Sequence, residues 1–131
     1  MADTMQFDLV SPERALASLK ATAVQIPGSE GDMTAMPMHA PTITTLRPGV
    51  LTVTSAEGTQ DYYVTGGFAE VGAEATTVLA ERAYPSDSEG KRAIEAHLEE
   101  ARAAAEEAHP DYRDAANKLV ADFVHLLNQM T

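Results

Sequence analysis

The sequence has 131 residues, a formal net charge of −11 at pH 7 and no cysteine. A surface this acidic repels phosphate backbones and anionic lipids, which argues against binding to nucleic acid or to a membrane surface. The absence of cysteine excludes disulfides, zinc–thiolate sites and thiol catalysis. No apolar run approaches the roughly 20 residues of a transmembrane helix, and the amino terminus lacks a secretion signal. We therefore expect a soluble, cytoplasmic protein whose membrane association comes through a partner.

The composition changes near Tyr84-Pro85, from Val, Ile, Thr, Tyr, Gly and Pro to Ala, Glu, Leu and Arg. This change predicts a β region followed by an α region. Short strand-like runs separated by glycine and proline are typical of a sandwich or small barrel, and Gly66-Gly67 allows a bulge or a close backbone approach. We predict an N-terminal β-sandwich domain (residues 1–84) and a C-terminal antiparallel two-helix hairpin (residues 85–131). The expected strands are 5–11, 21–27, 43–46, 50–55, 60–65, 68–71 and 75–79.

In the second part, Ser86 and Glu89 have the spacing of a capping box, so we expect the first helix to begin there. His109-Pro110 should end it, and Asp111 should cap the second helix. A seam lined mostly by alanine buries little area, so the hairpin should need to lean on another part of the chain. The predicted faces are Ala93, Ile94, His97, Leu98, Ala101, Ala104, Ala105 and Ala108 in the first helix, and Tyr112, Ala116, Leu119, Val120, Phe123, Leu126 and Leu127 in the second.

The segment Gly28 to Pro41 is rich in turn-forming residues and contains three methionines and a histidine. Met33, Met36, Met38 and His39 have the thioether and imidazole groups that soft Cu(I) prefers. One hypothesis is therefore a free-standing β-sandwich binding module that takes a small ligand or Cu(I) at Met33–His39. Methionines are also adaptable apolar contacts for a protein partner, which is the competing hypothesis.

Several short motifs, read in order, resemble the epsilon subunit of F-type ATP synthases. Each motif alone is weak, but their joint order over a chain of this length is specific. The resemblance covers nearly all of the first 84 residues and, more loosely, the Ala/Glu-rich second part. The motifs are Phe7-Asp8-Leu9-Val10-Ser11-Pro12-Glu13, Gly28-Ser29-Glu30-Gly31, His39-Ala40-Pro41, Leu46-Arg47-Pro48-Gly49, Gly66-Gly67-Phe68-Ala69-Glu70-Val71 and Val78-Leu79-Ala80-Glu81.

The resemblance implies a central-stalk rotor subunit that couples the gamma subunit to the c ring of a proton-translocating ATP synthase. Such a subunit lies at the cytoplasmic face of the bacterial inner membrane and is held there through the complex. The implied contacts with the polar loops of the c ring are Glu30, Asp32, Met36, Met38 and His39. The expected contacts with gamma are Met33, Phe68 and Val71.

Members of this family use the hairpin to inhibit ATP hydrolysis or, in some cases, to hold ATP. The ATP-responsive pattern maps onto residues 88–93, where Glu89 and Arg92 are the candidate nucleotide residues. Ser88 and Glu89 depart from the pattern, so the resemblance argues against ATP binding. Inhibition relies on basic residues of the second helix that meet the beta subunit, and here only Arg113 and Lys118 are basic. We predict weak or absent inhibition.

The sequence contains no catalytic constellation. It has no phosphate-binding loop of the Gly-x-x-x-x-Gly-Lys-Ser type and no nucleophile elbow. We also expect no cofactor and no metal at the scattered histidines. The sequence therefore predicts a non-catalytic subunit.

Overall fold

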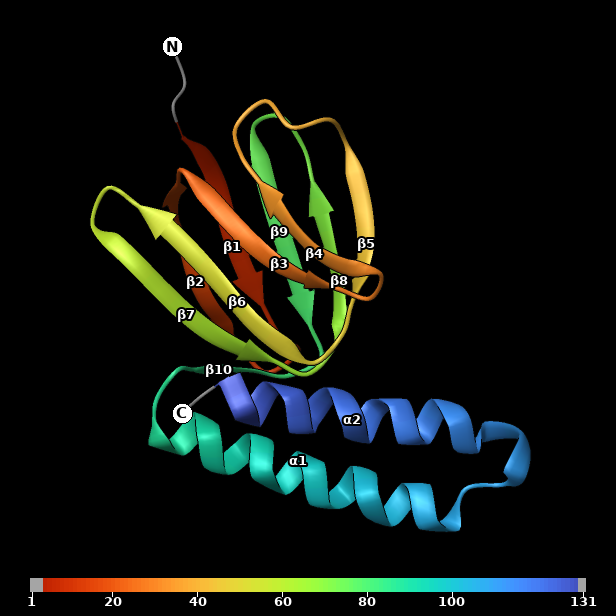
Figure 1. The fold of residues 1–131 in the computed structure, drawn as a ribbon. Helices are drawn as coiled ribbons and strands as arrows, with labels where there is room; N and C mark the ends of the chain where they lie inside the picture. The colour runs from red at the N-terminus through yellow and green to blue at the C-terminus, as the bar shows by residue number, and fades with distance from the viewer. Residues whose placement is uncertain (1–3, 130–131) are drawn as a thin grey trace.

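The computed structural model describes residues 4–129, in which a β-sandwich lies on one face of two antiparallel helices (Figure 1). Ten strands and two α-helices are present in these residues. The strands are β1 (Met5–Val10), β2 (Ala15–Ala21), β3 (Ala23–Gly28), β4 (Gly31–Ala35), β5 (Thr42–Leu46), β6 (Gly49–Ser55), β7 (Gly58–Val64), β8 (Gly67–Val71), β9 (Ala75–Ala80) and β10 (Ala83–Pro85). The helices are α1 (Ser88–Glu107) and α2 (Arg113–Gln129), with a 3-10 turn η1 (Pro110–Tyr112) between them.

Hydrogen bonds connect the strands in the order β10-β7-β6-β3-β5-β8-β9-β1-β2, and β4 pairs with the other edge of β3. The pair Gly28↔Leu46 is the register contact between β3 and β5, so it joins two layers that fold over each other. β1 and β9 run parallel, whereas the other pairs are antiparallel. The predicted sandwich followed by a two-helix hairpin is confirmed.

Alternation of apolar and polar residues places the sandwich core between the layers. β1 buries Met5, Phe7 and Leu9 on one face, and β6 buries Leu51 and Val53 in the same way. The predicted close approach at Gly66-Gly67 is also present. Gly67 has φ of +119°, and a Cβ there would lie 2.1 Å from the Leu79 carbonyl oxygen. Only glycine fits this position.

The hairpin packs on the sandwich through a second, smaller core. Ile94 and Leu98 of α1 and Phe123 and Leu126 of α2 cluster with Tyr63 of β7. The expectation that the hairpin leans on the rest of the chain is therefore confirmed. Neither helix of residues 4–129 has the length and apolar character needed to cross a bilayer.

The structure differs from the sequence prediction in three strands. β2 and β10 were not predicted. The segment from Gly28 to Pro41 is less irregular than predicted, because residues 31–35 form β4 against β3. These strands are short or show little alternation of apolar and polar residues. They form because they pair with strands that the local sequence pattern does not specify.

Both predicted helix caps are wrong. The Asp87 carboxylate, not Ser86, accepts the Gly90 N–H at 2.8 Å, and α1 begins at Ser88. Asp111 donates its own N–H to His109 Nδ1 at 3.1 Å instead of capping α2. Three members of the predicted apolar faces also lie outward: Tyr112 is 70% and Leu119 is 40% exposed, and Ala104 is exposed as well.

Candidate functional site

The outer face of β5, β8, β9 and β1 carries a row of apolar side chains. In the register of the sheet, Phe68 of β8 lies opposite Leu79 of β9, and Leu79 lies opposite Val10 of β1. Residues directly opposite each other in neighbouring strands share a face, so the three side chains form one row. Ile43 of β5 lies on the same face and is 73% exposed. We call these four residues the outer sheet face.

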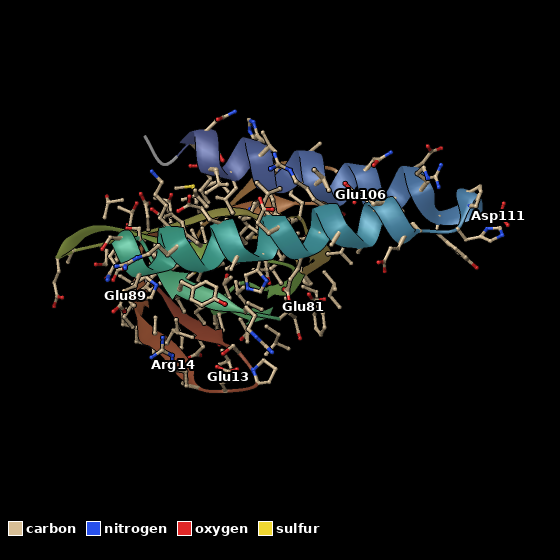
Figure 2. All side chains as sticks on the ribbon, turned by 90° about the horizontal axis from the view of Figure 1, so that it is seen from below. Glu13, Arg14, Glu81, Glu89, Glu106 and Asp111 are labelled. Carbon is tan, nitrogen blue, oxygen red and sulfur yellow. The ribbon has the colours of Figure 1, made fainter. Side chains whose placement is uncertain are left out.

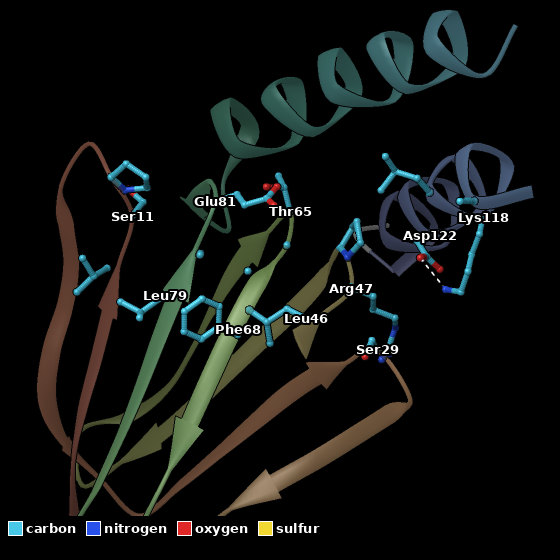
Figure 3. A pocket seen from close by; sticks show the side chains of 18 residues that line it. Ser11, Ser29, Leu46, Arg47, Thr65, Phe68, Leu79, Glu81, Lys118 and Asp122 are labelled. Carbon is cyan, nitrogen blue, oxygen red and sulfur yellow. Dashed lines mark hydrogen bonds and ion pairs between the residues drawn. The ribbon is translucent and has the colours of Figure 1, made fainter. Parts of the chain in front are cut away.

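The outer sheet face continues into a groove between the sheet and α2 (Figure 3). The groove has a volume of about 930 Å³, and Phe68 and Leu79 lie side by side on its floor. Ala115 and Leu119 of α2 line its opposite wall. Since Leu119 has no place in the hairpin core, its exposed side chain extends the apolar surface from the sheet onto the helix.

Three of the four charged groups that line the groove, Arg47, Lys118 and Asp122, are paired within the chain, and Glu81 is the fourth. Lys118 and Asp122 of α2 form an ion pair of 3.0 Å. Arg47 donates to the Asp32 carboxylate and to the Gly28 carbonyl oxygen, which ties the β3–β4 turn to the start of β6. Charges paired in this way leave the apolar floor as the dominant feature of the groove.

The connection between β4 and β5 forms the end of the sandwich remote from the helices (Figure 1). His39 donates its N–H to the Met36 carbonyl oxygen at 3.1 Å, which closes a turn over Pro37 and Met38. The Met38 N–H donates to the Ala73 carbonyl oxygen of the β8–β9 turn at 2.8 Å. Met36 is 54% and Met38 is 76% exposed. We call Met36 and Met38 the methionine tip.

The residues predicted to contact the c ring fall into two groups. Met36 and Met38 form the methionine tip, and His39 closes the same turn. Glu30 and Asp32 lie at the β3–β4 turn, where Asp32 is tied to Arg47, a residue of the groove beside α2. The structure does not bring Asp32 and His39 together, and the Asp32 carboxylate already has a partner.

The residues predicted to contact gamma also separate. Phe68 is 45% exposed on the outer sheet face, whereas Val71 is 1% exposed and belongs to the sandwich core. The burial of Val71 removes its side chain from any surface of this structure. Met33 lies on β4, is partly buried and packs against the sandwich core. The four proposed copper donors are thus divided between a packed strand and an exposed turn.

A polar and aromatic cluster holds α1 against β10. The Tyr84 hydroxyl and His97 Nε2 are 2.8 Å apart, and the His97 ring stacks on Phe123 with centroids separated by 6.0 Å. His97 Nδ1 lies 3.7 Å from a Glu100 carboxylate oxygen. Burial raises the pKa of Tyr84 and of Tyr63, which keeps both phenols protonated beneath the hairpin.

The candidate nucleotide residues, Glu89 and Arg92, are exposed in the first two turns of α1. Arg92 Nε donates to the Ser88 carbonyl oxygen at 3.4 Å, a contact within its own helix. Figure 2, seen from the helical side, shows Glu89 near one end of the hairpin and two other acidic residues, Glu106 and Asp111, toward the other end. These carboxylates therefore do not form one cluster around the candidate nucleotide residues.

Sequence reasoning found Phe68 but missed Ile43, Leu79 and Val10. The burial of Val71 could have been anticipated from Phe68, because residues three apart in a strand point to opposite faces. No such signal joins Val10, Ile43 and Leu79, since their common face depends on pairing between distant strands.

The fold and its exposed groove define a β-sandwich subunit with a helical appendage. Residues 4–86 match the protein family described as the ATP synthase delta/epsilon chain, beta-sandwich domain. The resemblance inferred from the sequence motifs is thereby confirmed.

Curated relatives narrow the assignment. The chain is 58% identical over 130 residues to the ATP synthase epsilon chain of a Ruegeria species, covering 99% of this chain and 93% of the relative. It is 61% identical over 123 residues to that of Rhodobacter capsulatus, covering 93% and 92% of the two chains. The chain belongs to the family of ATP synthase epsilon chains, and it is a non-catalytic subunit, as predicted.

Solved structures agree with this fold. A chain of the Euglena gracilis mitochondrial ATP synthase, in a structure of OSCP, F1 and the c-ring, matches with a TM-score of 0.76 at 23% identity. This match covers 98% of the present chain and 82% of the other. A chain in the structure of the Tetrahymena thermophila central stalk and c-ring matches with a TM-score of 0.59 at 14% identity, covering 94% and 96%.

Proposed function

We propose that the chain is a central-stalk rotor subunit that couples gamma to the c ring during ATP synthesis. Membership in the epsilon family supports this role, and the observation that carries it is the outer sheet face. An exposed aromatic side chain beside aliphatic neighbours on a rigid sheet is a typical anchor for a lasting protein interface.

The gamma subunit should bind over Phe68, Leu79 and Val10 and extend into the groove beside α2. The strands that carry this row are fixed by the core, because the residues next to Phe68 and Leu79 in the sequence point inward. Ala69 and Val78 are fully buried behind Phe68 and Leu79. A preformed surface of this kind binds with little loss of conformational entropy.

Co-purification with gamma tests this assignment. Phe68→Glu introduces a charge at the centre of the proposed contact, and we expect its affinity for gamma to fall by about 100-fold, as for a hot-spot residue. Ala103→Glu introduces the same group at an exposed position of α1 and is the matched control. Unchanged binding by Phe68→Glu, with both variants folded, would rule out this face.

We also propose that the end of the sandwich that carries the methionine tip meets the polar loops of the c ring. This would place the subunit at the cytoplasmic face of the bacterial inner membrane, peripheral through the complex. In a chain of net charge −11, residues 33–41, which include the connection between β4 and β5, contain no carboxylate. An end with few carboxylates is repelled less by anionic lipid as it approaches a membrane-embedded partner.

A pull-down with the detergent-solubilised c ring tests this end of the subunit. His39→Ala alters the end that carries the methionine tip, whereas Asp32→Ala breaks the pair with Arg47 at the other turn. We expect the larger loss of binding with His39→Ala. Equal retention of the c ring by wild type, both variants and a chain lacking the turn residues 36–39 would contradict the assignment.

The hairpin should be a weak regulator of ATP hydrolysis, with little contact to the beta subunit. Its two basic residues in α2 are engaged: Lys118 pairs with Asp122, and Arg113 donates to the Ala108 carbonyl oxygen at 3.2 Å. Deletion of residues 86–131 should leave the rate of hydrolysis by the assembled enzyme nearly unchanged. Hydrolysis several-fold faster after the deletion would overturn this proposal. The absence of ATP binding at Glu89 and Arg92 stays a prediction.

A further inference from the structure

The methionines of residues 4–129 differ sharply in exposure. Met5 is 1% exposed and accepts a hydrogen bond from the Thr76 hydroxyl at 3.3 Å, and Met33 is packed on the sandwich core. Met36 and Met38 are 54% and 76% exposed. Oxidation of methionine sulfur requires access by the oxidant, so the methionine tip is chemically distinct from the two interior methionines.

The backbone of the tip holds Met38 in a conformation that methionine rarely adopts. The turn from Met36 to His39 has proline at its second position and a φ of +71° at its third, Met38. These features match a type II turn, whose third position usually requires glycine or asparagine. The hydrogen bond from the Met38 N–H to Ala73 holds this arrangement against its strain. An unfavourable backbone conformation held at an exposed residue motivates the hypothesis of a functional role at this position.

The surroundings of the tip also favour a partner at the membrane. Thioethers are adaptable apolar contacts, and the segment that carries them has no carboxylate between Asp32 and Glu57. The neighbouring β8–β9 turn contributes one acidic side chain, Glu74. The tip is therefore an apolar contact set in a weakly charged part of a strongly acidic chain.

We propose that Met36 and Met38 form an oxidation-sensitive docking contact for the c ring. This inference rests on the proposed contact between the end that carries the methionine tip and the c ring. In the free chain, a sulfur lone pair attacks one oxygen of hydrogen peroxide and the O–O bond breaks. A sulfur–oxygen bond forms and sulfur is oxidised by two electrons. The proton of the attacked oxygen passes to the second peroxide oxygen, which leaves as water. Each methionine consumes one peroxide.

Oxidation changes the contact because a sulfoxide is polar and needs hydrogen-bond partners. Burying two such groups in a contact built for thioethers should weaken docking by about tenfold or more. Docking in turn covers the sulfurs and should slow their oxidation. The change is reversible, since sulfoxide reductases restore the thioether. The tip thereby makes assembly responsive to peroxide before, but not after, the subunit is in place.

The first experiment measures oxidation site by site. The full chain is treated with hydrogen peroxide, alone and in a complex of gamma, the chain and the detergent-solubilised c ring, and peptides are quantified by mass spectrometry. We expect Met38 and Met36 to oxidise first in the free chain, Met33 later and Met5 last. In the complex, oxidation of Met36 and Met38 should slow by at least about fivefold, because the c ring would cover sulfur atoms that are exposed in the free chain. Equal rates with and without the c ring would overturn the proposal.

The second experiment measures docking after oxidation. The peroxide-treated chain should bind the c ring about tenfold more weakly than the untreated chain. The matched control is Met36→Leu with Met38→Leu, which keeps the apolar bulk but cannot be oxidised at the tip. Its binding should be unaffected by peroxide, and a loss equal to that of wild type would overturn the proposal.

These experiments distinguish failure of the proposed docking to the c ring from failure of its proposed sensitivity to peroxide. If the treated and untreated wild-type chains bind the c ring equally well, the oxidation-sensitive contact is wrong and the proposed function stands. If the untreated chain does not bind the c ring, the proposed docking fails and the oxidation-sensitive contact fails with it.

Discussion

The sandwich and the hairpin differ in how each builds its core. The sandwich buries side chains from nearly every strand, including Phe7, Leu9, Ile26 and Leu51, between two layers that it provides itself. The hairpin core buries four large apolar residues of its own, Ile94, Leu98, Phe123 and Leu126, and includes Tyr63 of β7. The sandwich is self-sufficient, whereas the hairpin depends on it.

The contacts between the two regions are few and specific. Gly90 allows α1 to approach β7 and β10 closely, since a Cβ there would lie 2.3 Å from the Pro85 carbonyl oxygen and 3.0 Å from the Tyr63 ring. Tyr84 and His97 add one hydrogen bond. A region attached through a small core opens locally at a lower free energy than the fold that supports it.

Phe7→Ala should have the largest effect. Phe7 is fully buried between the layers, and its removal leaves a cavity that should lower the free energy of unfolding by about 3–5 kcal/mol. Urea unfolding followed by circular dichroism measures the change. A loss below about 1 kcal/mol, typical of a surface position, would contradict the two-layer core.

Gly90→Ala should loosen the hairpin although alanine is the better helix former. The added methyl group meets backbone at Pro85, and overpacking of this kind costs about 1–3 kcal/mol. Proteolysis and amide exchange of α1 should accelerate while the sandwich stays protected. Helix propensity alone predicts stabilisation by about 1 kcal/mol, and that result would refute the close approach.

Tyr84→Phe should reduce the stability of hairpin docking by about 1 kcal/mol at neutral pH through loss of the hydrogen bond to His97. Burial raises the Tyr84 pKa above its ordinary value of 10.0, so its contribution is fully present below pH 10 and is lost as the pH rises through the folded-state pKa. Unfolding at pH 8 and above pH 10 measures this dependence. The Tyr84→Phe variant should flatten it, and an unchanged slope would show that other groups, such as Tyr63, control it.

Met38→Gly should have the smallest effect and the opposite sign. Glycine relieves the positive φ of the turn but adds freedom to the unfolded chain, so we expect a gain of up to about 1 kcal/mol. Thermal unfolding compares the variant with Met38→Ala, which removes the side chain and keeps the strain. A glycine variant less stable than the alanine variant would be evidence against strain at this turn.

The sequence predicted the sandwich, the hairpin and its dependence on a neighbour because those features follow from local pattern. Apolar and polar residues alternate regularly in β1 and β6. The alanine-rich face of α1 indicates that this helix can bury little apolar surface area. β2 and β4 were missed because their pairing with β1 and β3 comes from the fold. The observed N-cap of α1, Asp87, lies one residue after the predicted one, Ser86. Both residue types are good N-caps, and tertiary contacts at Gly90 select between them.

The candidate site was predicted in part for the same reason. Phe68 and the exposed methionines were found because residue type alone marks them as unusual on a surface. The rest of the outer sheet face depends on register, which sets Leu79 beside Phe68 and Val10 across strands far apart in the sequence. The separation of Asp32 from His39 arises from β4, the strand that the sequence did not reveal.

Amide hydrogen exchange of Ile94→Ala tests most directly whether the hairpin depends on the sandwich and not the reverse. Ile94 is fully buried in the shared cluster, and its truncation should remove much of the hairpin's hold on Tyr63. We expect faster exchange throughout α1 and α2, with the amides of β1, β3 and β6 as protected as in the wild type. Equal acceleration in both regions would show a single cooperative unit and contradict this one-way dependence.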